Sequence, residues 1–213
     1  MPDFTSITGI MANTGTGVVS MPRQDQYQNL MVSQGLPPYA ELNINNKLFY
    51  GSTGTSAGIA PVADVPTTVS GATLFNPSTT LSLMIMQFAA YLDDGERTIG
   101  NSLWAGVSLA EESTAPTEIT GLVTGGLGHA GTPVGLLDNT ITLGTAIPWV
   151  CVAASKPLAD GSDGAGVVVN DMAGYFIVPP KGNFVLQTWN EGAGTAPLYG
   201  YSLIWAELVL TRA

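Results

Sequence analysis

The sequence predicts an all-β protein: a jelly-roll-like β-sandwich with an extended N-terminal arm. From residue 41 onward, about eight to ten short β-like runs are separated by turn residues. Amphipathic helices do not alternate with these runs, which argues against a parallel α/β sheet and for a sandwich or barrel. The 213 residues, 45% of them hydrophobic, suffice for one all-β domain with its own core. We therefore divide the chain into an arm or short helix (1–38) and a single β-sandwich domain (39–213).

The N-terminal segment differs in composition from the rest of the chain. Residues 1–20 are rich in Gly and Thr and are typical of an extended arm. Ser20, Pro22 and Gly35 stand where an N-cap, a first turn and a C-terminal glycine would delimit a short helix. A strand-like arm through the same residues is the alternative.

The first part of the domain contains three predicted strands and a run of less certain type. Glu41–Tyr50 alternates apolar and polar residues in its first half, which indicates a strand with one solvated face. Thr67–Ser70 and Ala72–Phe75 follow, and Asn76-Pro77 predicts a turn. Leu81–Leu92 has apolar residues on both faces, typical of a central buried strand or a buried helix. The β context favours the strand.

The second part continues the series after a turn signal at Asp93-Asp-Gly95. Pro179–Gly182 predicts a tight turn in which proline presets φ and glycine supplies a permissive position, so we expect a β-hairpin there. The predicted strands are Leu103–Leu109, Trp149–Ala153, Gly166–Val169, Tyr175–Val178, Asn183–Trp189 and Leu198–Leu210.

The charge pattern disfavours nucleic-acid and membrane partners. Charged residues make up 10% of the chain, against about 25% in soluble domains, and the net charge is −10. Affinity for nucleic acid or anionic lipid comes from clustered basic residues, and the six here are scattered. A surface this poor in charge suits a protein covered by neighbouring subunits, or a monomer solubilised by Ser, Thr and Asn. The basic residues are Arg23, Lys47, Arg97, Lys156, Lys181 and Arg212.

Gly54–Gly58 matches the Gly-x-Ser-x-Gly pattern of serine hydrolases. In that chemistry Ser56 would attack the substrate after a histidine takes its proton, and an acid would orient the histidine. Prolines follow too closely for the helix that the motif requires, so we expect a flexible loop. The candidate base is His129, and the candidate acids are Asp64, Asp93 and Asp94.

Gly126–Gly131 matches the Gly-x-Gly-x-x-Gly pattern of dinucleotide-binding loops. The pattern is informative only between a strand and a helix, where a phosphate meets the helix N-terminus. Thr132-Pro133 follows instead, so we predict a glycine-rich loop in which His129 is solvated.

The sequence predicts no catalytic residue, no cofactor-binding residue and no metal site. His129 is the only histidine and Cys151 the only cysteine, too few for a zinc site, and Cys151 is expected to be a small buried hydrophobe. Asp160–Gly164 and Asp93–Glu96 lack the full spacing of a calcium loop and are interpreted as Asp-Gly turns.

The four tryptophans all lie inside strand-like runs. We expect them to pack in the core, with a sugar-stacking platform as the alternative. They are Trp104, Trp149, Trp189 and Trp205.

Three groups of segments resemble a family of small structural proteins of tailed bacteriophages. The family shows an opening strand with a short polar-apolar motif, an Asn-Pro turn before an apolar strand, and a C-terminal hairpin with a Trp-Glu ending. Lys47 is set one position further back than the basic residue of the family. The matching segments are Tyr39–Leu42 with Asn46–Gly51, Leu74–Pro77 with Leu81–Ile85, and Ile177–Pro180 with Gly194–Pro197 and Ser202–Glu207.

The resemblance implies a virion component of jelly-roll-like fold that forms homotrimers and has no catalytic role. We expect a capsid decoration or cement subunit that stabilises the head and binds the major capsid protein or other virion proteins. The arm (1–38) would order on assembly. A tail, head-fibre or host-adhesion component is the first alternative, and a carbohydrate-binding module is the second. Without a signal peptide or spanning segment, the chain would be made in the host cytoplasm and reside in the virion.

Overall fold

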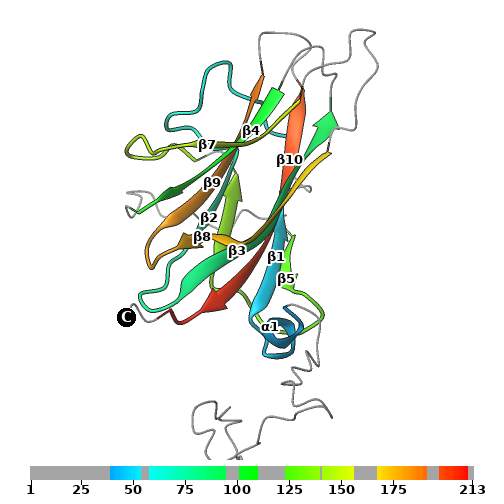
Figure 1. The fold of residues 1–213 in the computed structure, drawn as a ribbon, viewed down its shortest axis with the longest axis vertical. Helices are drawn as coiled ribbons and strands as arrows, with labels where there is room; N and C mark the ends of the chain where they lie inside the picture. The colour runs from blue at the N-terminus through cyan, green and yellow to red at the C-terminus, as the bar shows by residue number, and fades with distance from the viewer. Residues whose placement is uncertain are drawn as a thin grey trace, which may run out of the picture. The chain divides into compact units, whose positions relative to one another are not determined.

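The computed structural model describes residues 39–53, 58–94, 101–109, 123–139, 141–155, 167–190 and 197–210. Within these ranges ten strands form two five-stranded sheets that pack face to face, preceded by the short helix α1 (Ala40–Ile44) (Figure 1). The first sheet has the order β5 (Val123–Gly126), β1 (Leu48–Ser52), β10 (Leu198–Leu208), β3 (Ser82–Asp94) and β8 (Val167–Val178). The second has the order β6 (Leu136–Asn139), β2 (Ala72–Phe75), β9 (Asn183–Asn190), β4 (Asn101–Ser108) and β7 (Val150–Ser155).

The strand pairing is nested, and this makes the sandwich a jelly roll. β1 pairs with β10, β2 with β9, β3 with β8 and β4 with β7, all antiparallel, and successive pairs alternate between the two sheets. A long two-stranded ribbon has in effect been rolled up. The strands β5 and β6, nearest the tip of that ribbon, extend the sheets beside β1 and β2. The predicted fold is confirmed, while the arm and its helical alternative (1–38) lie outside the described residues.

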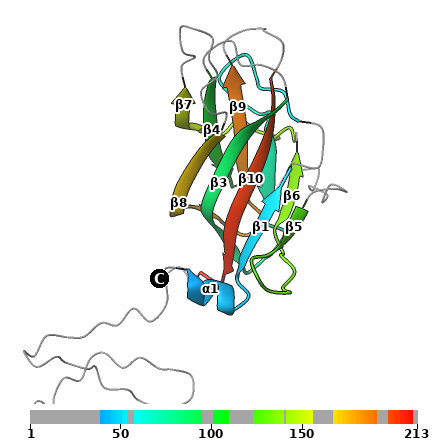
Figure 2. The same cartoon turned by 90° about the vertical axis from the view of Figure 1, so that its right-hand side faces the viewer.

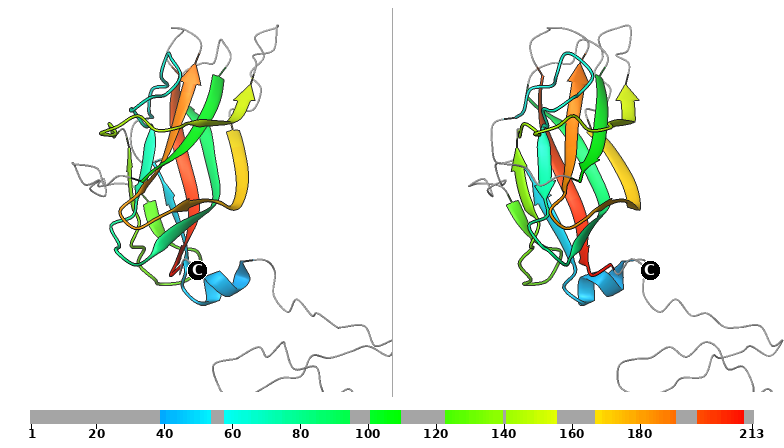
Figure 3. Two further views of the ribbon diagram at one scale, coloured as in Figure 1. Left: turned by 60° about the vertical axis from the view of Figure 1, so that its left-hand side comes forward. Right: turned by 90° about the vertical axis from the view of Figure 1, so that its left-hand side faces the viewer.

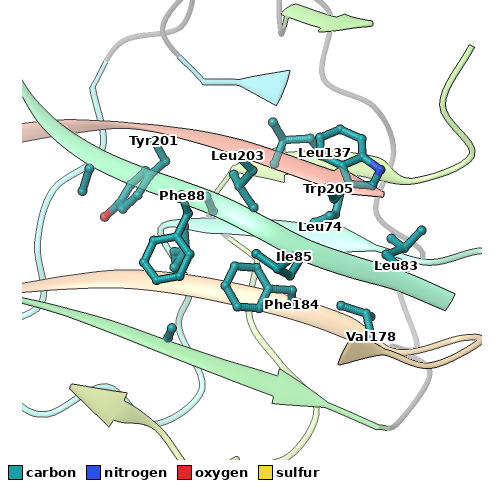
Figure 4. Close-up of a cluster of buried hydrophobic side chains, with 14 of the residues drawn as sticks. Leu74, Leu83, Ile85, Phe88, Leu137, Val178, Phe184, Tyr201, Leu203 and Trp205 are labelled. Atoms are coloured by element: carbon teal, nitrogen blue, oxygen red, sulfur yellow. The ribbon is translucent and has the colours of Figure 1, made fainter. Parts of the chain in front are cut away.

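The core lies between the sheets, where alternate side chains of both inner faces meet (Figure 4). The prediction that Leu81–Leu92 is a strand is confirmed by β3. Phe184 of β9 meets Phe88 of β3 and Phe176 of β8, with ring centroids 5.6 and 5.3 Å apart. The largest fully buried apolar side chains include Leu74, Leu83, Ile85, Phe88, Leu137, Phe184, Tyr201, Leu203 and Trp205.

Asn76 links the two places where the ribbon bends from one sheet to the other. Its side-chain amide donates hydrogen bonds to the carbonyls of Leu81 (2.8 Å) and Pro179 (3.0 Å). Its backbone N–H donates to Gly182 O (3.0 Å), and its carbonyl accepts from Lys181 N (2.9 Å). The predicted Asn76-Pro77 turn therefore joins β2 to β3 and also fixes the connection from β8 to β9.

The predicted hairpin at Pro179–Gly182 is wrong. The turn joins β8 in the first sheet to β9 in the second, so its flanking strands do not pair with each other. The positive φ of the turn falls on Lys181 (65°) and not on the glycine. Gly182 is needed for close approach instead, because a Cβ there would lie 2.9 Å from Ser108 O.

The predicted strand over Glu41–Tyr50 is also wrong in its first half. Ala40–Ile44 forms α1, and β1 begins only at Leu48. Asn46 has a positive φ of 56°, which Asn tolerates better than most residues, and the Lys47 N–H donates to Leu42 O (2.8 Å). This turn ends the helix and allows Leu42 to pack on the outer face of the first sheet.

Several strand boundaries differ from the prediction. Thr67–Ser70 is a loop with one isolated bridge at Val69. Gly166 lies outside the described residues, and the rest of the run Gly166–Val169 belongs with Tyr175–Val178 to one strand, β8. The pairing of β8 with β3 is interrupted between Ile85 and Gln87. The strands β5 and β6 were not predicted, because each is four residues long and lacks a clear alternation.

Replacing Asn76 by alanine should destabilise the sandwich by about 2–4 kcal/mol, because buried carbonyls in both crossover turns lose their donor. Urea unfolding followed by circular dichroism measures the change. Ser78→Ala is the control, since it disturbs the exposed part of the same turn. Equal midpoints for both variants would contradict the assigned role of Asn76.

Tyr201→Phe should change the alkaline stability of the protein. Burial raises the pKa of Tyr201 well above its ordinary value of about 10. Its hydroxyl group forms a hydrogen bond with Thr188 Oγ1 (2.9 Å). The folded state therefore favours the neutral phenol, so its stabilising contribution is complete below about pH 10 and is lost as the pH rises further. We expect the variant to be less stable by about 1–2 kcal/mol at neutral pH. Its unfolding free energy should fall less steeply than that of the wild type above pH ~10, and parallel pH profiles would be the contrary result.

Candidate functional site

His129 was predicted to be solvated, but its side chain is half-buried and holds a loop in place. Its Nδ1 accepts a hydrogen bond from Gly131 N (3.0 Å), so Nε2 carries the proton and donates it to Leu48 O (2.8 Å). The imidazole is half-buried and meets the ring of Phe49 edge-on, with centroids 5.3 Å apart. Both ring nitrogens are thus committed to the backbone, and the side chain fastens the loop after β5 to β1.

The Gly126–Gly131 motif serves this imidazole. A Cβ at Gly126 or at Gly131 would collide with the His129 ring, and Gly128 has a positive φ of 80°. The element that follows the loop is the strand β6, where a dinucleotide site would need a helix. The His129 ring therefore explains Gly126 and Gly131, and the left-handed backbone conformation explains Gly128.

Asp93 and Asp94, two of the candidate acids of the hydrolase hypothesis, lie far along the sheet from His129. Ser56 lies outside the described residues, as do the other residues of 54–57. Asp94 pairs with Leu198 at one end of β10, whereas Leu48, the partner of His129, pairs with Ala206 near the other end. Asp93 precedes Asp94 on β3, and Asp64 lies in the loop that precedes β2.

Cys151 is exposed on β7, so its predicted burial is wrong. The strand lies at the edge of its sheet, and only one of its faces is turned to the core. Asp93 and Asp94 end β3, and the rest of that run, together with Asp160–Gly164, lies outside the described residues.

In the described ranges no three His, Cys, Asp or Glu side chains are grouped closely enough to hold a metal ion. The part of the chain that the structure describes contains no helix with the length and apolarity needed to cross a membrane.

Three of the four tryptophans are only half-buried, and two of these three support loops. Trp205 alone is fully buried in the core, so the core-packing prediction holds for this residue. The indole N–H of Trp149 donates to Thr67 O (2.9 Å), and that of Trp189 donates to Ala63 O (2.8 Å). Trp104 Nε1 donates to Ser102 Oγ on the same strand (2.6 Å).

The outer face of the second sheet is covered by the chain itself. Segments 58–71 and 141–149, which we name the roof, cross it (Figure 3). Val62 bridges to Trp189, and the two segments bridge to each other through Val69 and Thr142. As a result, outward positions of this sheet are as buried as the core. They include Thr73, Phe75, Val185 and Gln187.

The outer face of the first sheet has a smaller cover, supplied by α1 (Figure 2). Leu42 of α1 and Leu127 pack against a second apolar cluster, in which Leu48, Met86 and Ala206 are buried. Met84, Ile204 and Leu208 belong to the same cluster but remain only partly buried.

This apolar surface continues to the edge of the sheet at β8. Met84 stands between Ala206 and Ile177 in the register, so the three side chains share the outer face. Ile177 is 47% exposed, and Tyr175, two residues before it on β8, is 83% exposed. We name Met84, Ile177, Ile204, Leu208 and Tyr175 the β8 patch. A contiguous exposed apolar surface of this kind is typical of an interaction site.

Glu207 is a buried acidic residue whose role the sequence did not indicate. Its Oε1 accepts hydrogen bonds from Val134 N (2.8 Å), Gly135 N (2.9 Å) and Trp205 Nε1 (3.1 Å). These bonds fasten the segment before β6 to the end of β10. The role of Glu207 is therefore to hold that segment against the core.

Searches against protein-family models, curated proteins and solved structures found no match to the chain.

Glu207→Ala should lower the free energy of unfolding by about 2–4 kcal/mol, because three buried N–H donors lose their acceptor. Glu207→Gln keeps a carbonyl oxygen for them and should cost less. Thermal unfolding of both variants measures the difference. A glutamine variant as unstable as the alanine variant would show that the charge, and not the acceptor, matters.

Proposed function

We propose that the chain is a non-enzymatic structural subunit of a tailed-phage particle and acts as a capsid decoration or cement protein. The observation that carries the proposal is the open β8 patch on a jelly roll whose other outer face is covered by its own roof. Such a protein is protected on one side and offers an apolar surface on the other. The proposed partners are further copies of the chain, in a homotrimer, and the major capsid protein or other virion proteins.

The fold is compatible with this role but does not single it out. Jelly rolls occur in viral capsid proteins, lectin domains and cupins, so function has to be argued from the surface. The resemblance of the sequence to structural proteins of tailed phages favours the first of these classes.

The alternatives receive less support from the described residues. The indole N–H groups of Trp149 and Trp189 hold the roof in place, which leaves them unavailable to hydrogen-bond a sugar. His129 uses both ring nitrogens for backbone contacts, which does not favour a role as a catalytic base. A tail, head-fibre or host-adhesion component would use the same apolar surface and differs only in its place in the particle.

Co-expression with the major capsid protein of the same genome tests the proposal. The chain should sediment with assembled shells, and cryo-electron microscopy should show it on their outer surface. Deleting residues 1–20 should leave a folded sandwich, because all the described strands come later, but should abolish incorporation. Full incorporation of the truncated chain would contradict a docking role for the arm. Failure of the full chain to sediment with shells would contradict the decoration role, and density on tails or fibres would favour the alternative placement.

A further inference from the structure

We propose that His129 is a proton-sensitive latch for the loop between β5 and β6 (127–135). The imidazole holds this loop against β1 while the ring carries one proton, and releases it when the ring takes up a second. The inference goes beyond the proposed function, because it concerns the response of the chain to acid and not its partner. Figure 2 shows the loop beside β1, close to α1.

The contacts of the two ring nitrogens can both be made only by the singly protonated imidazole. Nδ1 accepts a hydrogen bond from Gly131 N (3.0 Å), while Nε2 donates to Leu48 O (2.8 Å). A doubly protonated ring is a donor at both nitrogens. Its Nδ1–H would face the N–H of Gly131, so two donors would meet where one hydrogen bond existed. A second proton therefore breaks the latch at Nδ1.

The seat of the imidazole leaves a charged ring little room to turn toward another acceptor. A Cβ at Gly126 or at Gly131 would collide with the ring, which shows how closely the backbone encloses it. Phe49 closes a further side, with ring centroids 5.3 Å apart. A phenyl ring can attract a cation, but it offers no strong acceptor for the Nδ1–H. A charged imidazole therefore gains full hydration by leaving the seat.

The titratable groups on the elements around the loop already have other positions. The loop and β5 contain no titratable residue besides His129. Glu41 of α1 and Lys47, which precedes β1, are exposed, and Tyr50 of β1 lies beside Gly125. Glu207 of β10 is committed to the far end of the loop, where its Oε1 accepts three N–H groups. The hydrogen bonds described for His129 itself go to backbone groups.

Release of the latch would uncover apolar side chains at one end of the first sheet. His129 and Gly131 cover one side of Phe49, which is buried in the core. Leu127, two residues before His129, packs on the outer cluster and donates its N–H to Leu48 O (3.2 Å). The far end of the loop stays in place, because Glu207 holds it independently. Acid therefore loosens the loop as far as Gly131 and exposes apolar surface next to the β8 patch.

Nitrogen NMR of the isotope-labelled full chain tests the inference, because His129 is the only histidine and its ring signals are unambiguous. At about pH 7.5 the ring should be in the Nε2–H form, and it should take up a second proton as the pH falls to about 5. Hydrogen-exchange protection of the Leu127 and Gly131 amides should fall about ten-fold or more in step with this proton. The amides of Lys181 and Gly182, at the bend held by Asn76, are the internal control and should keep their protection.

His129→Gln is the matched variant, since glutamine offers a donor and an acceptor but does not titrate. Its loop amides should have the same protection at both pH values, and a remaining fall would assign the response to another group, such as Glu207, and overturn the inference. Thermal unfolding shows whether the variant is folded, and the wild-type measurement decides alone if it is not.

Four results with the wild type would each overturn the inference. They are an Nδ1–H form at neutral pH, a ring that stays singly protonated until the protein unfolds, a second proton taken up without loss of protection at Gly131, and a simultaneous loss of protection at Lys181 and Gly182, which would indicate global unfolding.

Discussion

The structure depends on the bend at which a two-stranded ribbon passes from one sheet to the other. Asn76 holds both strands of the ribbon at this bend, because its side chain and backbone bind the turn after β2 and the turn after β8. These turns are about a hundred residues apart in the sequence. Without a fixed bend, the pair β2/β9 and the pair β3/β8 would not face each other, and the core between them would not close. A single buried amide thus supports the nested pairing that defines the roll.

The same rolling explains why the two outer faces differ. The two roof segments belong to the connection from β1 to β2 and to the connection from β6 to β7. They cross the outer face of the second sheet, where the indoles of Trp149 and Trp189 hold them. Among the described residues, the outer face of the other sheet receives α1 and the loop that His129 fastens to Leu48. One face is therefore closed by the chain's own segments. The other face keeps an apolar surface from β10 to β8. The described surface best suited to contact a partner therefore lies on the first sheet.

Strands with a long, continuous sequence pattern could be predicted from the sequence. The predictions failed where contacts between residues far apart in the chain determine the local structure. The run that became β3 was identified because its apolar residues and its β context agree. Pro179–Gly182 has the composition of a hairpin turn, but Asn76 recruits it to a crossover. The glycines around His129 resemble a phosphate loop because close approach to a ring and close approach to a phosphate both require the absence of a Cβ. The β8 patch could not be predicted, because an alternating apolar strand does not reveal which of its faces the fold will leave uncovered.

The low charge of the chain is informative only when combined with this geometry. A net charge of −10 keeps copies apart at long range, while the absence of described charges from the β8 patch removes the desolvation cost of close contact there. Under the proposed function, copies would repel one another through their acidic surfaces and contact virion partners through this patch, a combination that favours ordered assembly over aggregation. For the proposed structural role, the positions of the few charges therefore matter more than their number.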